Sequence, residues 1–449
     1  MSRRDKHSVA IVPLFLSLVL DGTFAFDHVA ASASLKTLSL ANTTVLSSTN
    51  LPEPVAVQTR GACDQWGWVS DPICRVQVNI RTSATPSVYA EAWLPDTWYG
   101  RIVGLGNGGV GGYMYPLLCL PHSLALPRSP PTTGDIYTGQ YFLNNPDVIK
   151  DFSYSATHLQ TVIGKQLVQA YYGRPHDKSY FLGCSTGGRQ GTQAAFKCPE
   201  DFDGIVAGAP GTDWNHLLGW WGGMECEFGA PKTPGSSVSY ILRELWDVVE
   251  AEVLNQCDAL DGAKDGIITE PDDCNFRPEV LFCSSTKTEK CLSQSQVNAL
   301  KKAYAPLAGD SNGITGIIEG STLEWYLNTV FNNTSYNFSD FGLPHIALAD
   351  MINPGDAAMF SGDFSAFKNC GGKFVTYHRD QATLSARTTS SNLSTLDTFY
   401  RLFLVPGMQH CNSGPGSWAF GQSQGLNVVN ASTRNVLGGR GLGREGGSA

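Results

Sequence analysis

Hydrophobic and polar residues alternate through the segment Cys74–Leu94, in the runs CRVQVNI and VYAEAWL. A period of two places successive side chains on opposite faces, so this segment is predicted to form β-strands. The apolar run Arg101–Leu105 predicts a buried strand that leads into the glycine-rich loop Gly106–Gly112. Residues 121–149, with Pro127, Pro130 and Pro131, are predicted to be loop.

Strand and helix patterns then alternate along the chain. Helices are predicted at Phe152–Tyr172 and Gly188–Lys197, and strands at Ser179–Leu182 and Asp203–Ala209. This alternation is typical of a parallel α/β sheet. Residues 214–370 lack this alternation of strand and helix patterns and are interpreted as an inserted domain. Strand patterns resume at 373–377 and 400–405, so the predicted core is discontinuous.

Composition narrows the function classes. The 449 residues carry a net charge of −9, which argues against a nucleic-acid-binding protein. Hydrophobic residues make up 42% of the chain, which excludes a disordered protein and allows a large core.

The N-terminus predicts secretion. Arg3, Arg4 and Lys6 precede the apolar run Val9–Leu20, and this arrangement is typical of a signal peptide. The run is shorter than the roughly 20 residues that span a bilayer, and no later segment is apolar enough, so no membrane association is expected. Glycosylation sequons begin at Asn42, Asn332, Asn333, Asn337, Asn392 and Asn430. In an oxidising compartment most of the twelve cysteines are expected to form disulfides.

A nucleophile motif lies between a predicted strand and a predicted helix. Gly183–Gly187 reads GCSTG and fits the G-x-S-x-G nucleophile elbow of α/β-hydrolases, with Ser185 as the nucleophile. The backbone N–H of Thr186 is the expected first oxyanion donor. Gly108, in the loop after the strand 101–105, is the expected second donor.

Four histidines follow this serine: His216, His345, His378 and His410. The order in this fold is serine, acid, histidine, and His410 follows a strand near the end of the core, so it is the predicted base. His378 lies within a strand pattern and is interpreted as a packed core histidine.

Several long motifs carry a family resemblance. GCSTGGRQG at 183–191, PEDFDGIVAGAP at 199–210 and PGMQHC at 406–411 closely resemble the tannase/feruloyl esterase family. The resemblance implies a secreted serine esterase with an α/β-hydrolase core and a lid domain. It also implies a disulfide between Cys184 and Cys411, the neighbours of the nucleophile and the base. The expected organisation is a signal peptide (1–26), a core in two parts (27–213 and 371–420), a lid (214–370) and a poorly ordered tail (421–449).

The catalytic acid departs from the family pattern. Relatives carry an aspartate in a YHGxxDP motif, whereas this chain reads YHRDQATLS from Tyr377. Asp380 is the carboxylate in this segment and is assigned as the acid, with Asp397 as the fallback.

A calcium loop is expected in the lid. Three carboxylates within eight residues suit Ca²⁺, and the family has a calcium loop here. The resemblance assigns as ligands Asp258, Asp261 and Asp265 with the carbonyls of Ala263 and Ile267. Further disulfides are proposed at Cys257–Cys274 and Cys283–Cys291. Cys198 stands where relatives usually have an aromatic residue, so one free thiol is expected among the remaining cysteines. The sequence leaves the pairing of these six open: Cys63, Cys74, Cys119, Cys198, Cys226 and Cys370.

The family implies substrates that are small aromatic esters or feruloylated cell-wall polysaccharides, with gallate esters of tannins as the alternative. Trp214, Trp220, Trp221 and Trp325 either stack on a phenolic ring or form the lid core, and the sequence leaves both open. The altered acid segment also allows an inactive secreted calcium-binding homologue.

Overall fold

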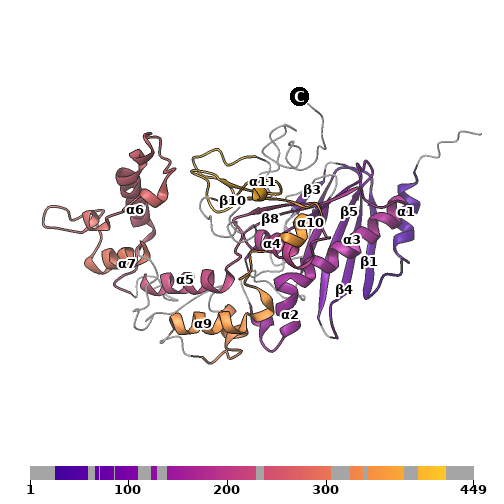
Figure 1. Cartoon of the computed structure of the whole chain (residues 1–449), viewed down its shortest axis with the longest axis horizontal. Coiled ribbons are helices and arrows are strands. Elements are labelled where there is room, and N and C mark those ends of the chain that lie inside the picture. Colours follow the sequence, from indigo (N-terminus) through magenta and orange to yellow (C-terminus); the bar gives the residue numbers. More distant parts are fainter. Residues whose placement is uncertain are drawn as a thin grey trace, which may run out of the picture.

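A nine-stranded sheet is the largest element of the computed structural model, which describes residues 26–58, 66–69, 71–84, 86–109, 123–128, 139–228, 237–304, 324–336, 341–378 and 393–420 (Figure 1). Its strands are β1 (Thr43–Leu51), β4 (Ile73–Arg81), β5 (Ser87–Pro95), β6 (Arg101–Leu105), β7 (Ser123–Arg128), β8 (Lys178–Cys184), β9 (Gly204–Gly208), β10 (Lys373–His378) and β11 (Tyr400–Leu404). A separate hairpin pairs β2 (Val55–Gln58) with β3 (Trp66–Val69).

The strand order is β1-β4-β5-β7-β6-β8-β9-β10-β11. Neighbours from β1 to β7 are antiparallel, and neighbours from β7 to β11 are parallel. The carboxyl ends of the parallel strands therefore lie along one edge of the sheet, where ligand sites of such folds form. The predicted α/β class is confirmed, and the sheet continues after the insertion through β10 and β11.

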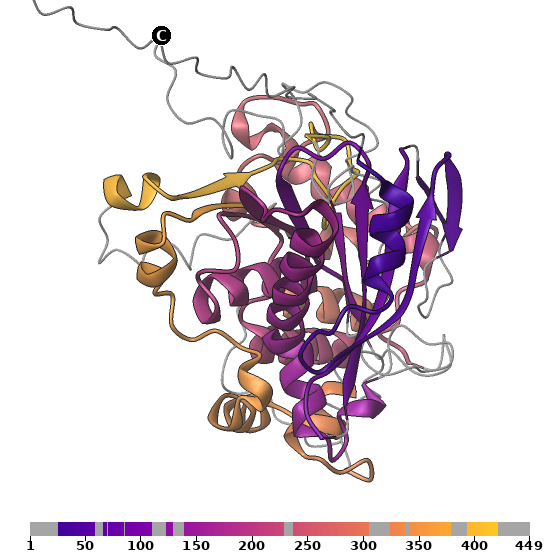
Figure 2. The same ribbon diagram turned by 90° about the vertical axis from the view of Figure 1, so that its right-hand side faces the viewer.

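Helices cover the sheet and build the lid. They are α1 (His28–Leu35), α2 (Pro146–Lys150), α3 (Ala156–Tyr172), α4 (Thr186–Lys197), α5 (Trp214–Glu227), α6 (Arg243–Cys257), α7 (Gln294–Tyr304), α9 (Leu343–Ile352), α10 (Ser365–Asn369) and α11 (Leu393–Asp397). Short 3-10 turns are η1 (Gln140–Phe142), η3 (Asp258–Asp261), η4 (Pro271–Asp273), η5 (Pro278–Leu281) and η8 (Pro354–Asp356), and π-helical turns are η2 (Asp151–Ser155) and η6 (Tyr326–Val330). Figure 2 shows α1 and α3 lying along the sheet, while α6 and α7 stand away from it in Figure 1.

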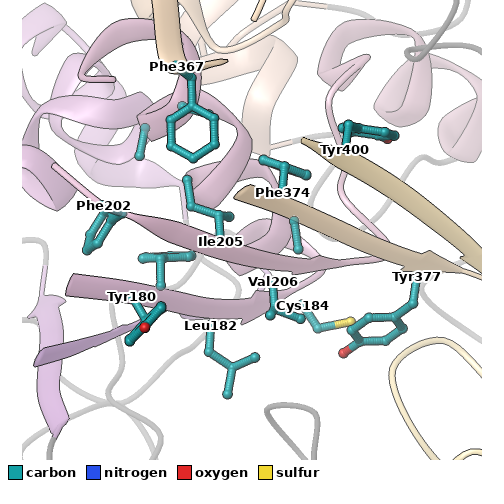
Figure 3. Packing of buried hydrophobic residues seen from close by; sticks show 14 of the residues in the cluster. Tyr180, Leu182, Cys184, Phe202, Ile205, Val206, Phe367, Phe374, Tyr377 and Tyr400 are labelled. Atoms are coloured by element: carbon teal, nitrogen blue, oxygen red, sulfur yellow. The ribbon is translucent and has the colours of Figure 1, made fainter. Parts of the chain in front are cut away.

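The apolar residues form separate cores. Phe181, Leu182, Ile205 and Val206 are fully buried around β8 and β9, where α4 packs (Figure 3). Phe367 of α10 joins this cluster, so the last part of the insertion packs with the sheet. A second cluster joins the segment 142–152 to α5, η6 and α9, and the α6–α7 region has a small core of its own.

One predicted loop is wrong. Residues 121–149 contain β7 and α2. The pairing of β7 with β6 is short, Val103 with Ser123 and Gly104 with Leu124, and its position between β5 and β6 depends on both neighbours. Such a strand is stabilised by tertiary context that local patterns do not contain. Among the described helices, none has the length and hydropathy needed to cross a membrane.

Candidate active site

Ser185 occupies a strained turn between β8 and α4. Its backbone angles are φ 63° and ψ −123°, a conformation that residues other than glycine rarely adopt. Its N–H donates to the carbonyl of Gly208 at 2.9 Å, and its own carbonyl accepts from the N–H of Arg189 at 3.0 Å. Hydrogen bonds to β9 on one side and to the first turn of α4 on the other therefore stabilise the strained conformation of Ser185. This is the predicted geometry of a nucleophile elbow.

The glycines around the serine are needed for close backbone contacts. A Cβ on Gly183 would lie 2.6 Å from the carbonyl carbon of Gly187, and one on Gly187 would lie 2.8 Å from the carbonyl oxygen of Asn107. A Cβ on Gly188 would lie 2.2 Å from the carbonyl oxygen of Gly208. No side chain fits at these distances, so the motif is a packing requirement as well as a signature.

The loop after β6 lies against the elbow, where the oxyanion donors were predicted. The hydroxyl of Thr186 donates to the carbonyl of Gly109 at 2.6 Å. The N–H of Asn107 donates to the side chain of Gln190 at 3.1 Å, which ties the loop to α4. The assignment of Thr186 and Gly108 as oxyanion donors remains a prediction.

A disulfide joins the two halves of the core beside the nucleophile. Cys184 and Cys411, 227 residues apart in the chain, are bonded with their Cα atoms 6.0 Å apart. Figure 3 shows Cys184 in the buried cluster to which Tyr377 also belongs. This pairing and the predicted pairs Cys257–Cys274 and Cys283–Cys291 are all present. The first of them fixes the chain neighbours of Ser185 and His410 to each other.

His410 lies in the loop after β11. Desolvation, with a smaller contribution from nearby His378, holds the pKa of His410 below its usual range. The imidazole is therefore neutral at neutral pH, as a general base requires. His378 is the last residue of β10 and only partly buried, so the prediction of a packed core histidine does not describe it.

Asp380, the predicted acid, lies outside the described residues. It follows His378 by two positions, and His378 pairs with Leu404 of β11, so the segments after β10 and β11 leave the sheet at the same edge. The fallback Asp397 precedes β11 and forms an ion pair with Arg401 at 3.0 Å. A five-residue strand, about 17 Å long, lies between Asp397 and the loop that carries His410, which argues against Asp397 as the acid; the assignment of the acid remains a prediction.

The lid tryptophans divide into two groups. Trp214 and Trp325 are 4% and 0% exposed and belong to the second core cluster. Trp220 and Trp221 are 43% and 48% exposed. These two line an open pocket of about 440 Å³ between α5 and α6, together with Met224, Phe228, Tyr240, Ile241, Arg243 and Trp246. Of the four lid tryptophans, only Trp220 and Trp221 are therefore exposed enough to stack on the phenolic ring of a substrate.

The predicted calcium loop follows α6, and the Cys257–Cys274 disulfide closes it. Buried Asp258 accepts hydrogen bonds from the N–H groups of Gly266 and Ile267, at 2.9 and 3.1 Å. Asp261 and Asp265 likewise accept from backbone N–H groups of the loop. The three carboxylates do not form a group whose oxygens all lie within 4.8 Å of one another. The donor chemistry suits calcium, but in this conformation the carboxylates bind the loop's own backbone.

Sequence reasoning missed Arg189, which is fully buried in α4. Its guanidinium donates to the carbonyls of Phe152 and Ser153 at 3.1 Å, in the π-helical turn η2. It also stacks on the rings of Phe152 and Trp214, 4.4 and 4.9 Å from their centroids, and burial lowers its pKa to about 9. It thus joins the nucleophile's helix to the start of the lid. The only sequence signal was the place of this arginine in the predicted helix that follows the nucleophile.

Comparisons with known proteins agree with this arrangement. A family model described as tannase and feruloyl esterase matches residues 74–339. A probable feruloyl esterase B-2 of Aspergillus flavus is 39% identical over 383 residues, which are 78% of this chain and 73% of that protein. The crystal structure of feruloyl esterase B from Aspergillus oryzae superposes with a TM-score of 0.79 at 30% identity, covering 92% of this chain and 89% of that one. Tannin acyl hydrolase from Aspergillus niger, at 17% identity and a TM-score of 0.66 over 90% of this chain and 86% of its own, shares the fold. The chain therefore belongs to the tannase and feruloyl esterase family of carboxylic ester hydrolases.

Proposed function

We propose that the protein is a secreted feruloyl esterase that releases hydroxycinnamic acids from small aromatic esters and from feruloylated cell-wall polysaccharides. The observation that carries this proposal is the strained Ser185 elbow, disulfide-linked through its neighbour to the segment that holds His410. The two relatives reported above at 30% or more identity carry the names probable feruloyl esterase B-2 and feruloyl esterase B, which favours ferulate over gallate.

The chemistry follows from the placement of these groups. Ser185 Oγ attacks the ester carbonyl while His410 takes its proton, and the N–H of Thr186 stabilises the oxyanion. His410 then protonates the leaving alcohol, which gives an acyl-enzyme. Water activated by His410 releases the acid and restores the serine. Asp380 would orient the imidazole.

Turnover of methyl ferulate and methyl gallate by the wild-type protein tests the proposal, with Ser185→Ala as the control. Faster hydrolysis of methyl ferulate supports a feruloyl esterase, and faster hydrolysis of methyl gallate supports a tannase. Absence of turnover on both esters would favour the inactive homologue.

Two variants test whether Asp380 or Asp397 is the catalytic acid. Asp380→Asn should lower kcat by up to about 10⁴-fold if Asp380 orients the base. Asp397→Asn should leave kcat unchanged because its ion pair lies at the other end of β11. The reverse pattern would transfer the role to Asp397.

Calcium is proposed as a structural ion of the lid loop, bound by Asp258, Asp261 and Asp265 with the carbonyls of Ala263 and Ile267. The oxygen-rich donors and the disulfide that closes the loop support this proposal. Binding would require the carboxylates to turn away from the backbone N–H groups that they now accept from. Calcium should raise the melting temperature of the wild type but not of Asp261→Ala. A wild-type melting temperature that does not change when EDTA is added would contradict the calcium proposal.

Secretion is proposed from the N-terminal pattern and from the disulfides, which persist in oxidising compartments. Expression of the full chain in a fungal host should place the protein in the medium with residues 1–26 removed. N-terminal sequencing of the secreted protein measures the cleavage position.

A further inference from the structure

Three metal-ligating side chains meet at the end of α4 that is remote from the nucleophile. They are His158 in the first turn of α3, Cys198 at the C-terminus of α4, and Asp201 in the segment before β9. One ligand atom of each lies within 4.8 Å of the others. Within the described ranges, no other group of three or more His, Cys, Asp or Glu side chains meets this criterion.

Burial and backbone hydrogen bonds hold the ligand-bearing residues of this cluster in place. Asp201 is 6% exposed, while His158 and Cys198 are partly buried. The N–H of Asp201 donates to the carbonyl of Cys198 at 3.0 Å, and the ammonium of Lys165 donates to the carbonyl of Asp201 at 2.6 Å. These bonds fix two of the ligand-bearing residues through their backbones. Cys198 forms no disulfide, so its sulfur is available as a ligand.

The chemical types of the three ligand atoms indicate which class of cation the cluster would bind. One imidazole nitrogen, one thiolate sulfur and one carboxylate oxygen suit Zn²⁺, whereas calcium and magnesium prefer oxygen donors alone. Zinc bonds are about 2.0 to 2.3 Å long, so tetrahedral ligands stand within about 4 Å of each other, compatible with this cluster. We propose that His158, Cys198 and Asp201 form a zinc site with a water molecule as the fourth ligand.

Binding of the ion would displace two hydrogens. Nδ1 of His158 lies 2.9 Å from a carboxylate oxygen of Asp201, close enough for one hydrogen to be shared between them. Zinc binding by Nδ1 would displace that hydrogen and would also release the thiol proton of Cys198. The twelve residues of α4, about 18 Å, separate this site from Ser185, so its role is to hold α3, α4 and the segment before β9 together.

The test measures zinc binding on the untagged, disulfide-intact protein, stripped with a chelator and then saturated with calcium so that oxygen sites are filled. Titration with ZnCl₂ in a calorimeter should give one equivalent per chain, and zinc should raise the melting temperature. Cys198→Ser should weaken binding at least tenfold and lose the thermal shift. Cys370→Ser is the matched control because Cys370 is an exposed free cysteine outside the cluster, and it should bind like the wild type.

Cobalt(II) supplies a second readout that does not depend on stability. The wild type should show the near-ultraviolet absorption of a cobalt–thiolate bond, and Cys198→Ser should not. Cys198→His should retain zinc binding without that absorption, since imidazole replaces the thiolate. Zinc binding that is absent from the wild type, or equal in the wild type and Cys198→Ser, would overturn the proposal. Esterase activity does not enter the test, so its result is independent of the proposed reaction.

Discussion

Removal of the Cys184–Cys411 disulfide should destabilise the protein far more than removal of a short-range disulfide. The bridge closes a loop of 227 residues, and the chain-entropy relation gives about 5.4 kcal/mol at 25 °C for a loop of that length. The Cys283–Cys291 bridge spans 8 residues, for which the same relation gives about 2.5 kcal/mol. The double alanine variants should therefore differ by about 3 kcal/mol in free energy of unfolding, a factor of about a hundred in the unfolding equilibrium.

Activity should separate the two variants as well. The long-range bridge joins the chain neighbours of Ser185 and His410, whereas the short one lies in the lid beside η5. A displacement of about 1 Å between nucleophile and base lowers the rate by about a hundredfold. The Cys184→Ala/Cys411→Ala variant should lose about that much in kcat/KM for methyl ferulate, and the Cys283→Ala/Cys291→Ala variant should keep its rate.

Urea unfolding followed by tryptophan fluorescence gives the free energies, and initial rates on the folded fraction give kcat/KM. Equal losses of stability in the two variants would refute the loop-length argument. Full activity of Cys184→Ala/Cys411→Ala in the folded fraction would refute the positioning argument, whatever its stability.

Three further predictions concern single residues. Desolvation and His378 lower the pKa of His410, so kcat/KM should rise with pH through a midpoint below about 6.5, and His378→Asn should move that midpoint upward. Burial raises the pKa of Glu91, but the ion pair with Arg75 and the hydrogen bonds from Tyr89 and Trp93 together outweigh burial, and the net shift is downward. The stabilisation by Glu91 is therefore present above its ordinary pKa and is lost as pH falls through the lowered pKa. In urea unfolding at neutral pH, Glu91→Gln should therefore cost about 3 kcal/mol, and an unchanged midpoint would contradict this. Gly187→Ala places a Cβ 2.8 Å from the carbonyl oxygen of Asn107, so activity and melting temperature should fall together.

Local patterns were sufficient where neighbours in the sequence determine the structure. The strand predicted at Arg101–Leu105 has those bounds, and the elbow was predicted because strand, serine and helix are contiguous. Contacts between residues far apart in the chain could not be predicted from local sequence patterns. The partners of Arg189 are backbone carbonyls 36 and 37 residues away, and no pattern in its own helix identifies them. The division of the lid tryptophans into buried and exposed pairs likewise depends on how α5 packs against η6 and α9.

These contacts give α4 a particular role in the site. Its first residue follows the strained serine, whose neighbour Cys184 is covalently bound to the segment that carries His410. Its first turn is held by Arg189, whose guanidinium reaches η2 and the first residue of α5. Its last turn ends at Cys198, beside His158 of α3. Because the helix is fastened at both ends, a substitution at either end should shift the helix as a rigid body and so displace the serine. Amide hydrogens of α4 should therefore exchange together and more slowly than those of α6, which packs in the separate core of the lid.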